Sequence, residues 1–411
     1  MKRITLYVIS FIIFILGDNI LEIVGWHHRD FTSLFIYRVY PLFYIVIGLL
    51  VYYFIIGKIT VADLLFRMKN ELTYLSICFG IVIYGQLTKN SNPMSWFLDS
   101  LVIPCIILIF LRITDKKILN DFKKWMYCFF FLNAGIAVIE KVSSRLLFLK
   151  ESPWYFDYFR STALFGHPLN NALIMSVLTI ILFLATKETY LKMGVLLAGM
   201  LSIFCFGARG ALLGVFGAIL LNIILNALGF TKEPSRNIKS GLMYLASFAL
   251  ILIVVISFTS LGDRIAGLAH VDESAEARVG SLNILQYVDL HDLFWTGISL
   301  SKIDMLQYLS GVEIIENFYI EWLLNFGLAV TVILIVSLIR FLYCMMHNIG
   351  ADIKLPILFT LIAVSSSNNS LATSTYVITI LVMAYYVFLD FKVLEVKKVP
   401  TDNILYESLP Y

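Results

Sequence analysis

Long apolar runs separated by short polar segments follow one another along the whole chain. A helix needs roughly 20 mostly apolar residues to cross the hydrocarbon core of a bilayer. Runs of that order occur about twelve times. They cover residues 4–24, 34–57, 72–87, 96–111, 125–142, 168–185, 190–206, 210–229, 241–261, 318–345, 355–370 and 374–391. The pattern predicts an all-α, polytopic integral membrane helix bundle, with residues 1–411 forming a single transmembrane domain.

Composition supports the membrane and excludes a nucleic-acid partner. The chain is 60% hydrophobic and only 14% charged, and its mean hydropathy is +0.86. A soluble fold cannot bury so much apolar surface. The net charge of +3 is too small to attract a polyanion along a whole face.

Basic residues are distributed unevenly between the two sides of the predicted bundle. With the N-terminus inside, 20 of the 31 Lys and Arg residues fall in cytoplasmic segments or toward the cytoplasmic ends of the predicted helices. Short cytoplasmic loops are enriched in Lys and Arg. The bias predicts an even number of helices with both termini in the cytoplasm, and residues 4–16 are read as an uncleaved first helix.

Two segments on the outer side are much longer than simple connections, namely 143–167 and 262–317. The second lies between the ninth and tenth predicted helices. Within it, the apolar positions of residues 275–290 suit an amphipathic helix lying at the membrane interface. Segment 262–317 is therefore predicted to form a large, partly helical extracytoplasmic cap.

Neither the cysteines nor the other metal-ligand types predict a metal site. The five cysteines all fall inside apolar runs without metal-ligand spacing, so they are expected to be buried as small hydrophobic residues. Residues 18–30 hold two histidines and three acidic residues, which resembles a metal cluster. A polar cap at the membrane interface explains the same residues and is favoured.

The first candidate site surrounds the start of the sixth predicted helix. Arg160 comes shortly before His167, and Pro168 is followed by Asn170 and Asn171. Proline is favoured at the first helical position, so Pro168 is expected to open the helix with its N-terminus facing outward. Free N–H groups, the helix dipole and Arg160 together suit a phosphate or diphosphate. His167 is alternatively a capping neighbour of the helix.

The second candidate is the very short hairpin 206–211, which has Arg209 at its tip. An arginine near the hydrocarbon boundary is costly unless it is paired or reaches the interface. Arg209 also adds a full charge to the outward-facing start of the eighth helix. Either it binds an anion there or it is a simple interfacial anchor.

The third candidate is the large outer segment and its exit into the tenth helix. The segment holds Arg264, Arg278 and His291, and it ends at Glu316 and Asn317. Structural roles explain each of these as well. Asn317 suits an N-cap and Glu316 suits the positive end of a helix dipole. The loop arginines suit solvated surface.

These motifs together resemble the O-antigen polymerase and ligase superfamily. The resemblance rests on Arg160, the helix start 166–172, the Arg-Gly-Ala hairpin 209–211, and Asn317 followed ten residues later by Gly327. It covers about 160–330, the predicted helix number and the position of the large outer loop. Ligases of this superfamily typically carry His-Asn where this chain has Glu316-Asn317, so the resemblance favours a polymerase.

The resemblance implies a glycosyltransferase of the bacterial inner membrane that uses neither a metal nor another cofactor. Its substrates are glycans linked to undecaprenyl diphosphate, joined into O-antigen, capsule or exopolysaccharide, with a flippase and a chain-length regulator as partners. Arginines stabilise the departing diphosphate, and a carboxylate or imidazole deprotonates the attacking hydroxyl. The arginines are Arg160, Arg209, Arg264 and Arg278; the candidate bases are Glu316, His167 and His291; the glycan-binding candidates are Asn170, Asn171 and Asn317.

Two alternatives remain open at this point. An O-antigen ligase transfers a finished chain to lipid A-core with the same chemistry. A twelve-helix secondary transporter belongs to a different class, but transporters place ionisable residues and broken helices near the midplane. Here the polar residues gather toward the outer ends of the predicted helices, which favours the glycosyltransferase.

Overall fold

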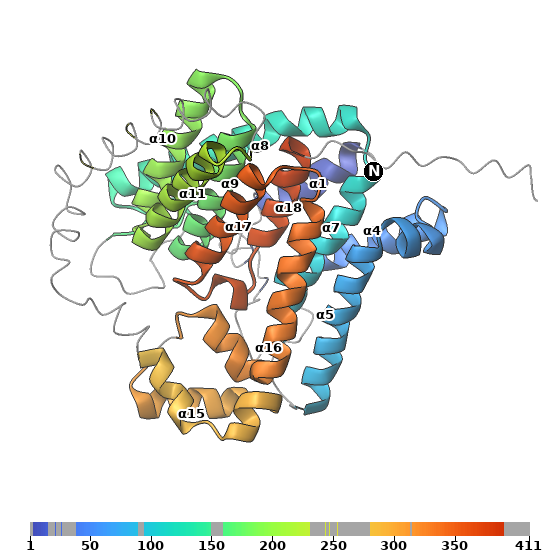
Figure 1. Ribbon diagram of the computed structural model, residues 1–411, viewed down its shortest axis with the longest axis vertical. Helices are drawn as coiled ribbons and strands as arrows, with labels where there is room; N and C mark the ends of the chain where they lie inside the picture. Colours follow the sequence, from blue (N-terminus) through green and yellow to red (C-terminus); the bar gives the residue numbers. More distant parts are fainter. Residues whose placement is uncertain are drawn as a thin grey trace, which may run out of the picture.

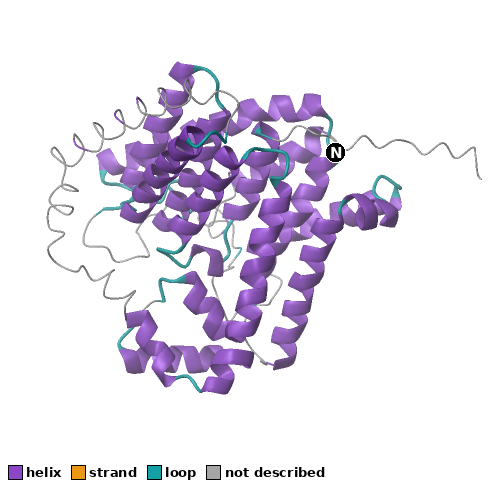
Figure 2. Ribbon diagram, in the orientation of Figure 1, coloured by secondary structure: helices purple, strands orange, loops and turns teal. Residues whose placement is uncertain are grey.

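The computed structural model describes residues 3–14, 38–88, 94–148, 159–230, 280–312 and 315–389, with a few single positions elsewhere. Within these residues all regular structure is helical and no strand occurs (Figure 2). The α-helices are α1 (Arg3–Phe14), α4 (Pro41–Ile55), α5 (Lys69–Thr88), α6 (Ser95–Phe97), α7 (Ile103–Arg112), α8 (Lys116–Ser143), α9 (Pro168–Ala185), α10 (Thr189–Cys205), α11 (Arg209–Ala227), α15 (Leu300–Ser310), α16 (Phe318–Met345), α17 (Ala351–Ser365) and α18 (Val377–Phe388).

Six described helices are long and apolar enough to span a membrane, which makes the chain a multi-pass membrane protein by helix length and composition. They are Lys69–Thr88, Ser95–Arg112, Lys117–Ser143, Pro168–Ala185, Arg209–Ala227 and Phe318–Met345. Helices α1, α4, α10 and α18 are apolar but shorter. The predicted total of about twelve spans stays a prediction, because span 241–261 lies almost entirely outside the described residues.

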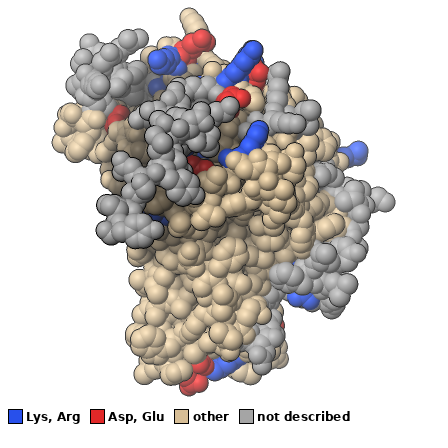
Figure 3. Space-filling model, turned by 90° about the vertical axis from the view of Figure 1, so that its right-hand side faces the viewer, with Lys and Arg blue, Asp and Glu red and all other residues tan. Residues whose placement is uncertain are grey.

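Some helices lie at the buried centre of the bundle, and others lie at its periphery with one face exposed. In Ser95–Arg112, 89% of the residues are buried, and in α9 83% are buried, whereas in the most apolar stretch of α5 only 33% are buried. Every residue of α18 is buried, and α18 packs on α7 and α9. On the face in Figure 3, charged atoms lie mainly toward the upper and lower ends, with a broad band of other residues between. A band with few charged residues between charged ends matches a bilayer.

Helices α8 to α11, and likewise α17 and α18, alternate in direction along the chain, so one end of the bundle carries a consistent set of termini. Helices α9, α11 and α18 begin there, and α8, α10 and α17 end there, as the contacts between the connecting segments show. We call it the cap end, because the described part of the large loop, residues 280–312, lies beside it (Figure 1). We call residues 280–312 the cap.

The cap has its own apolar cluster, separate from the main core. It includes Ile284, Val288 and Ile303 of the cap and Ile320 and Leu324 of α16. The amphipathic helix expected over 275–290 ends early: the described part closes with a 3₁₀ turn, η4 (Ile284–Tyr287), and the backbone of Val288 is extended. Ile284 and Val288 are buried in the cluster of the cap, whereas Leu282 and Leu290 are exposed.

Helix α16 is interrupted at Gly327, where the cap docks. Gly327 has φ 77° and ψ 166°, a conformation open essentially to glycine alone. A Cβ atom there would lie 2.7 Å from the carbonyl carbon of Trp295, in the π-helical turn η5 (Asp292–Thr296). The N–H of Ile298 donates to the Leu324 carbonyl at 2.6 Å. The hydroxyl of Tyr84, on α5, donates to the Trp295 carbonyl at 2.7 Å.

The sequence led us to expect that all five cysteines are buried, and this prediction is wrong for two of them. Cys78, Cys105 and Cys205 are buried, but Cys128 is exposed and Cys344 is half-buried. An apolar run in a peripheral membrane helix presents one face to lipid, so a place within such a run does not imply burial in protein.

Candidate functional site

The segment that carries Arg160 lies directly against the hairpin that carries Arg209. The N–H of Ser161 donates to the carbonyl oxygen of Cys205 at 3.1 Å, at the end of α10. Helix α11 begins at Arg209. Both arginines are half-buried. Two of the four predicted diphosphate ligands therefore stand on adjoining segments of the cap end.

The same hairpin packs closely on the turn between α17 and α18. A Cβ atom on Gly210 would lie 2.8 Å from Oγ of Ser367, so the absence of a side chain at position 210 permits this approach. The polar segment 365–370 is therefore packed beside the arginine hairpin.

The start of α16 adjoins this turn as well. The N–H of Phe318 donates to the carbonyl of Asn368 at 3.3 Å, and the carboxyl of Glu321 is hydrogen-bonded to Asn369. Asn317 holds the N-cap position and is buried, but its side chain makes no capping hydrogen bond. Glu316, the predicted general base, is half-buried just before it.

A buried carboxylate that the sequence analysis did not single out holds the Arg160 segment. Glu140, in the last turn of α8, is fully buried. Its Oε2 accepts hydrogen bonds from the Ser161 hydroxyl at 2.5 Å and from the N–H groups of Thr162 and Ala163 at 3.0 and 2.9 Å. Its Oε1 accepts from the N–H of Leu147 at 2.9 Å.

One sequence signal could have revealed Glu140. An anion in the last turn of a helix faces the negative end of the helix dipole. In a largely apolar helix such a carboxylate needs dedicated donors, and a buried charge is retained only when it is well bonded. A glutamate at the outer end of a predicted span is thus a marker for a nearby loop that supplies N–H groups.

The predicted helix opening at Pro168 is confirmed. Helix α9 begins at Pro168, and His167 is its N-cap, with Nδ1 accepting from the N–H of Leu169 at 3.3 Å. The side chain of Asn171 donates to the carbonyls of Thr162 and His167 at 2.6 and 3.0 Å. Asn170 is buried next to it. In this structure, His167 and Asn171 tie the loop to the helix start.

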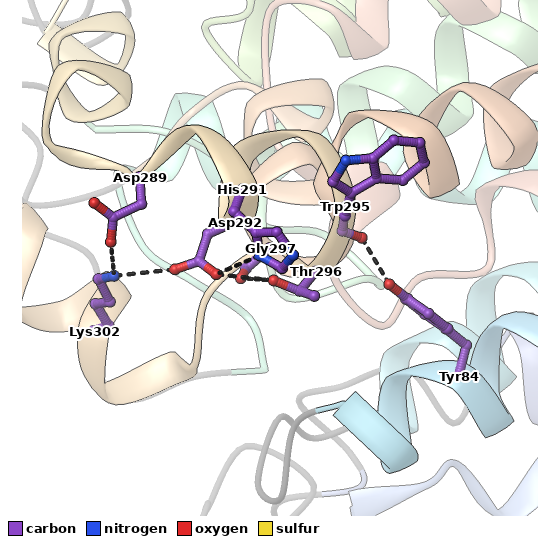
Figure 4. Close-up of polar contacts among 8 residues, drawn as sticks. All are labelled: Tyr84, Asp289, His291, Asp292, Trp295, Thr296, Gly297 and Lys302. Carbon is purple, nitrogen blue, oxygen red and sulfur yellow. Dashed lines mark hydrogen bonds and ion pairs between the residues drawn. The ribbon is translucent and has the colours of Figure 1, made fainter.

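His291 lies in the cap, apart from the contacts that join these segments. It is exposed, and its Nδ1 lies 3.9 Å from Oδ1 of Asp292 (Figure 4). Lys302 reaches both Asp292, at 3.2 Å, and Asp289, at 3.4 Å. The Thr296 hydroxyl also donates to Asp292, at 2.9 Å. These bonds close η5 onto the start of α15.

Electrostatics at this cap cluster follow from the same contacts. Partial burial tends to raise the pKa of Asp292, but the hydrogen bonds from Thr296 and Lys302 outweigh it and hold that pKa below its ordinary value. The hydrogen bond to Asp292 raises the pKa of Lys302. Both groups are therefore held in their charged forms near neutral pH.

The two remaining predicted diphosphate ligands, Arg264 and Arg278, lie outside the residues that the structure describes. The same holds for nearly all of the polar cluster at 18–30. Among the described residues, no group of three or more His, Cys, Asp or Glu side chains is arranged to hold a metal ion.

The arrangement offers a specific chemical environment. Helices α9, α11 and α16 all begin at the cap end, and each start presents N–H groups and the positive end of a helix dipole. Arg160 and Arg209 add two full positive charges on adjoining segments. Glu316 and Glu321 place carboxyl groups at the start of α16. The positive charges suit an anionic ligand, and a carboxylate beside them can accept a proton from a neighbouring hydroxyl group.

Comparison of the chain with protein-family models, with curated proteins and with solved structures finds no match.

Proposed function

We propose that the protein is an integral membrane glycosyltransferase that polymerises oligosaccharide repeats linked to undecaprenyl diphosphate. The observation that carries the proposal is the meeting of the Arg160 segment, the Arg209 hairpin and the start of α16 around the turn after α17. These are the same three stretches that resemble the O-antigen polymerase and ligase superfamily. They are far apart in the sequence, so their meeting is not a consequence of chain proximity.

In the proposed reaction, a hydroxyl of the incoming lipid-linked repeat attacks the anomeric carbon of the growing chain. A new glycosidic C–O bond forms, the bond between the anomeric carbon and the phosphate oxygen breaks, and undecaprenyl diphosphate leaves. Arg160 and Arg209 stabilise the charge that develops on the leaving diphosphate. Arg264 and Arg278 are proposed to join them from the large loop.

Glu316 is proposed to take the proton from the attacking hydroxyl, with His167 and His291 as the other candidates. Asn170, Asn171 and Asn317 are the proposed glycan contacts. Fixed cations can stabilise this leaving group without a metal or another cofactor. The product is an O-antigen, capsule or exopolysaccharide chain.

The proposed location is the bacterial inner membrane, with the cap on the outer side and both termini in the cytoplasm. The unequal distribution of Lys and Arg supports this orientation. The proposed partners are a flippase and a regulator of chain length. A polymerase at the outer surface needs a flippase to deliver the lipid-linked repeat, and it needs a regulator to limit the length of the product.

The test is polymerisation by purified protein in liposomes, with a synthetic undecaprenyl-diphosphate-linked repeat as substrate and a gel to resolve the products. Wild-type protein is expected to give a ladder. Glu316→Gln should abolish it, and Arg209→Ala should reduce it at low substrate. Arg340→Ala is the matched control, because Arg340 is exposed near the other end of α16.

Three results would contradict the proposal in whole or in part. Wild-type protein that forms no ladder with several repeat structures would overturn the polymerase assignment. Transfer to added lipid A-core, without growth of lipid-linked chains, would indicate a ligase. Full activity of Glu316→Gln would remove Glu316 from the proposed mechanism.

A further inference from the structure

The loop of Arg160 is fixed on both sides of that residue. On one side, Nζ of Lys141 donates to the carbonyl of Phe159 at 2.7 Å. On the other side, the N–H of Ser161 is bonded to the end of α10. The next two N–H groups and the Ser161 hydroxyl all point to one oxygen of Glu140. The backbone of Arg160 is thereby clamped between α8 and α10.

The local backbone conformation depends on that carboxylate. Ala163 has φ 36°, the left-handed region that a residue with a Cβ atom enters only at a cost. Successive N–H groups in such a bend form a small concave site for an anion, and here the anion is the Glu140 carboxylate of the protein itself. Removing the carboxylate leaves buried N–H groups without an acceptor.

Glu140 is not itself suited to act on substrate. It is fully buried, and both of its oxygens already accept hydrogen bonds from Leu147, Ser161, Thr162 and Ala163. A general base must reach the proton it removes. The effect of Glu140 on the reaction must therefore pass through the segment that it holds.

We propose that Glu140 is a positioning residue for the diphosphate site: it bends the segment 161–163 and so holds Arg160 beside the Arg209 hairpin. This inference rests on the proposed function for the identity of the ligand. The holding of the segment itself depends only on the described contacts. Pre-organised charge binds an anion more tightly than charge on a loop that must first be ordered.

The choice of substitution follows from the geometry. Glu140→Ala removes all four accepted hydrogen bonds. Glu140→Gln keeps one carbonyl oxygen, which can face Ser161, Thr162 and Ala163, but it places an NH₂ group against the N–H of Leu147. Glutamine should therefore restore part of what alanine loses. Glu188→Ala is the matched control, because Glu188 is an exposed acidic residue that precedes α10 and makes no capping hydrogen bond.

The experiment has two readouts on purified full-length protein in detergent. Hydrogen exchange followed by mass spectrometry reports the protection of peptides that cover 159–167. Binding of undecaprenyl diphosphate gives Kd for the wild type, Glu140→Ala, Glu140→Gln, Arg160→Ala and the double variant Glu140→Ala/Arg160→Ala. The double variant asks whether the two residues act through one another.

Glu140→Ala is expected to speed exchange in 159–167 and to raise Kd at least tenfold, with a smaller rise for Glu140→Gln. In the Arg160→Ala background, the same change should alter Kd less than twofold. Glu188→Ala should match the wild type in both readouts.

Unchanged exchange in Glu140→Ala would overturn the claim that Glu140 holds the segment. Equal effects of Glu140→Ala with and without Arg160 would overturn the claim that it acts through Arg160. Faster exchange in Glu140→Ala, combined with wild-type protein that binds no undecaprenyl diphosphate, would leave the clamp standing and overturn its link to a diphosphate. That last outcome separates failure of the proposed function from failure of the clamp.

Discussion

Gly327→Ala should release the cap from α16. The glycine occupies a backbone region that costs other residues about 1–3 kcal/mol. The added Cβ would also lie 2.7 and 2.8 Å from the carbonyl carbon and oxygen of Trp295, which are backbone atoms that cannot rotate away. Any shift of η5 threatens the hydrogen bond from Ile298 to Leu324, which contributes about 0.5–1.5 kcal/mol. The two contributions add to about 1.5–4.5 kcal/mol against the docked cap.

Hydrogen exchange of peptides covering 291–298 measures this directly, because local opening has its own free energy. A cost of about 1.5–4.5 kcal/mol raises the open population roughly 10- to 1,600-fold, at tenfold for each 1.4 kcal/mol. Gly80→Ala is the control: its Cβ would meet nothing within 4 Å, and Ala favours a helix over Gly. Wild-type protection of 291–298 in Gly327→Ala would refute the reasoning, as would equal loss of protection in every helix.

Three further results are expected. Protection of the cap from hydrogen exchange should fall as the pH drops below about 4, because the Asp292 carboxylate, whose pKa is lowered, stabilises the fold only while it is ionised. Asp292→Asn should lose this pH dependence, and a wild-type cap whose protection is unaffected by acid would contradict the prediction. The buried carboxylate of Glu71 forms an ion pair with Arg112 at 2.5 Å, so Arg112→Gln should destabilise the protein by about 3–5 kcal/mol. Adding Glu71→Gln to that variant should restore part of the lost stability, as measured by thermal unfolding. Tyr84→Phe removes the hydrogen bond to the Trp295 carbonyl and should destabilise docking of the cap by about 0.5–1.5 kcal/mol, measured by exchange of the same 291–298 peptides. Unchanged exchange would show that this hydrogen bond does not stabilise the docked cap.

The sequence was most informative where one physical signal dominates. Helix α9 spans Pro168–Ala185, the bounds that hydropathy and Pro168 predict. The outer bounds of α16, Phe318–Met345, also match the predicted span, but hydropathy did not predict the break at Gly327. Helix α8 begins at Lys116, well before the predicted start at residue 125. Its first turns are rich in lysine, and a search for apolar runs does not register polar residues that continue a helix.

Features that depend on partners distant in the chain were not predicted. Gly327 entered the analysis only as a motif position, because nothing in its neighbours shows that Trp295 would pack against it. Glu140 was overlooked because its donors come from residues 147 and 161–163. Asn317 was expected to be able to cap α16, yet it sits at that position without a capping bond. Local patterns determine helices, whereas these contacts depend on how the helices assemble.

The account depends most on a diphosphate binding at the cap end. A photoreactive undecaprenyl diphosphate analogue, with its reactive group beside the diphosphate, tests this by cross-linking to purified protein followed by peptide mapping. We expect labelled peptides from 159–171 and 205–211, with labelling reduced by Arg209→Ala and unchanged by Arg340→Ala. Labelling at the opposite end of the bundle, or labelling that Arg209→Ala leaves unchanged, would contradict the account.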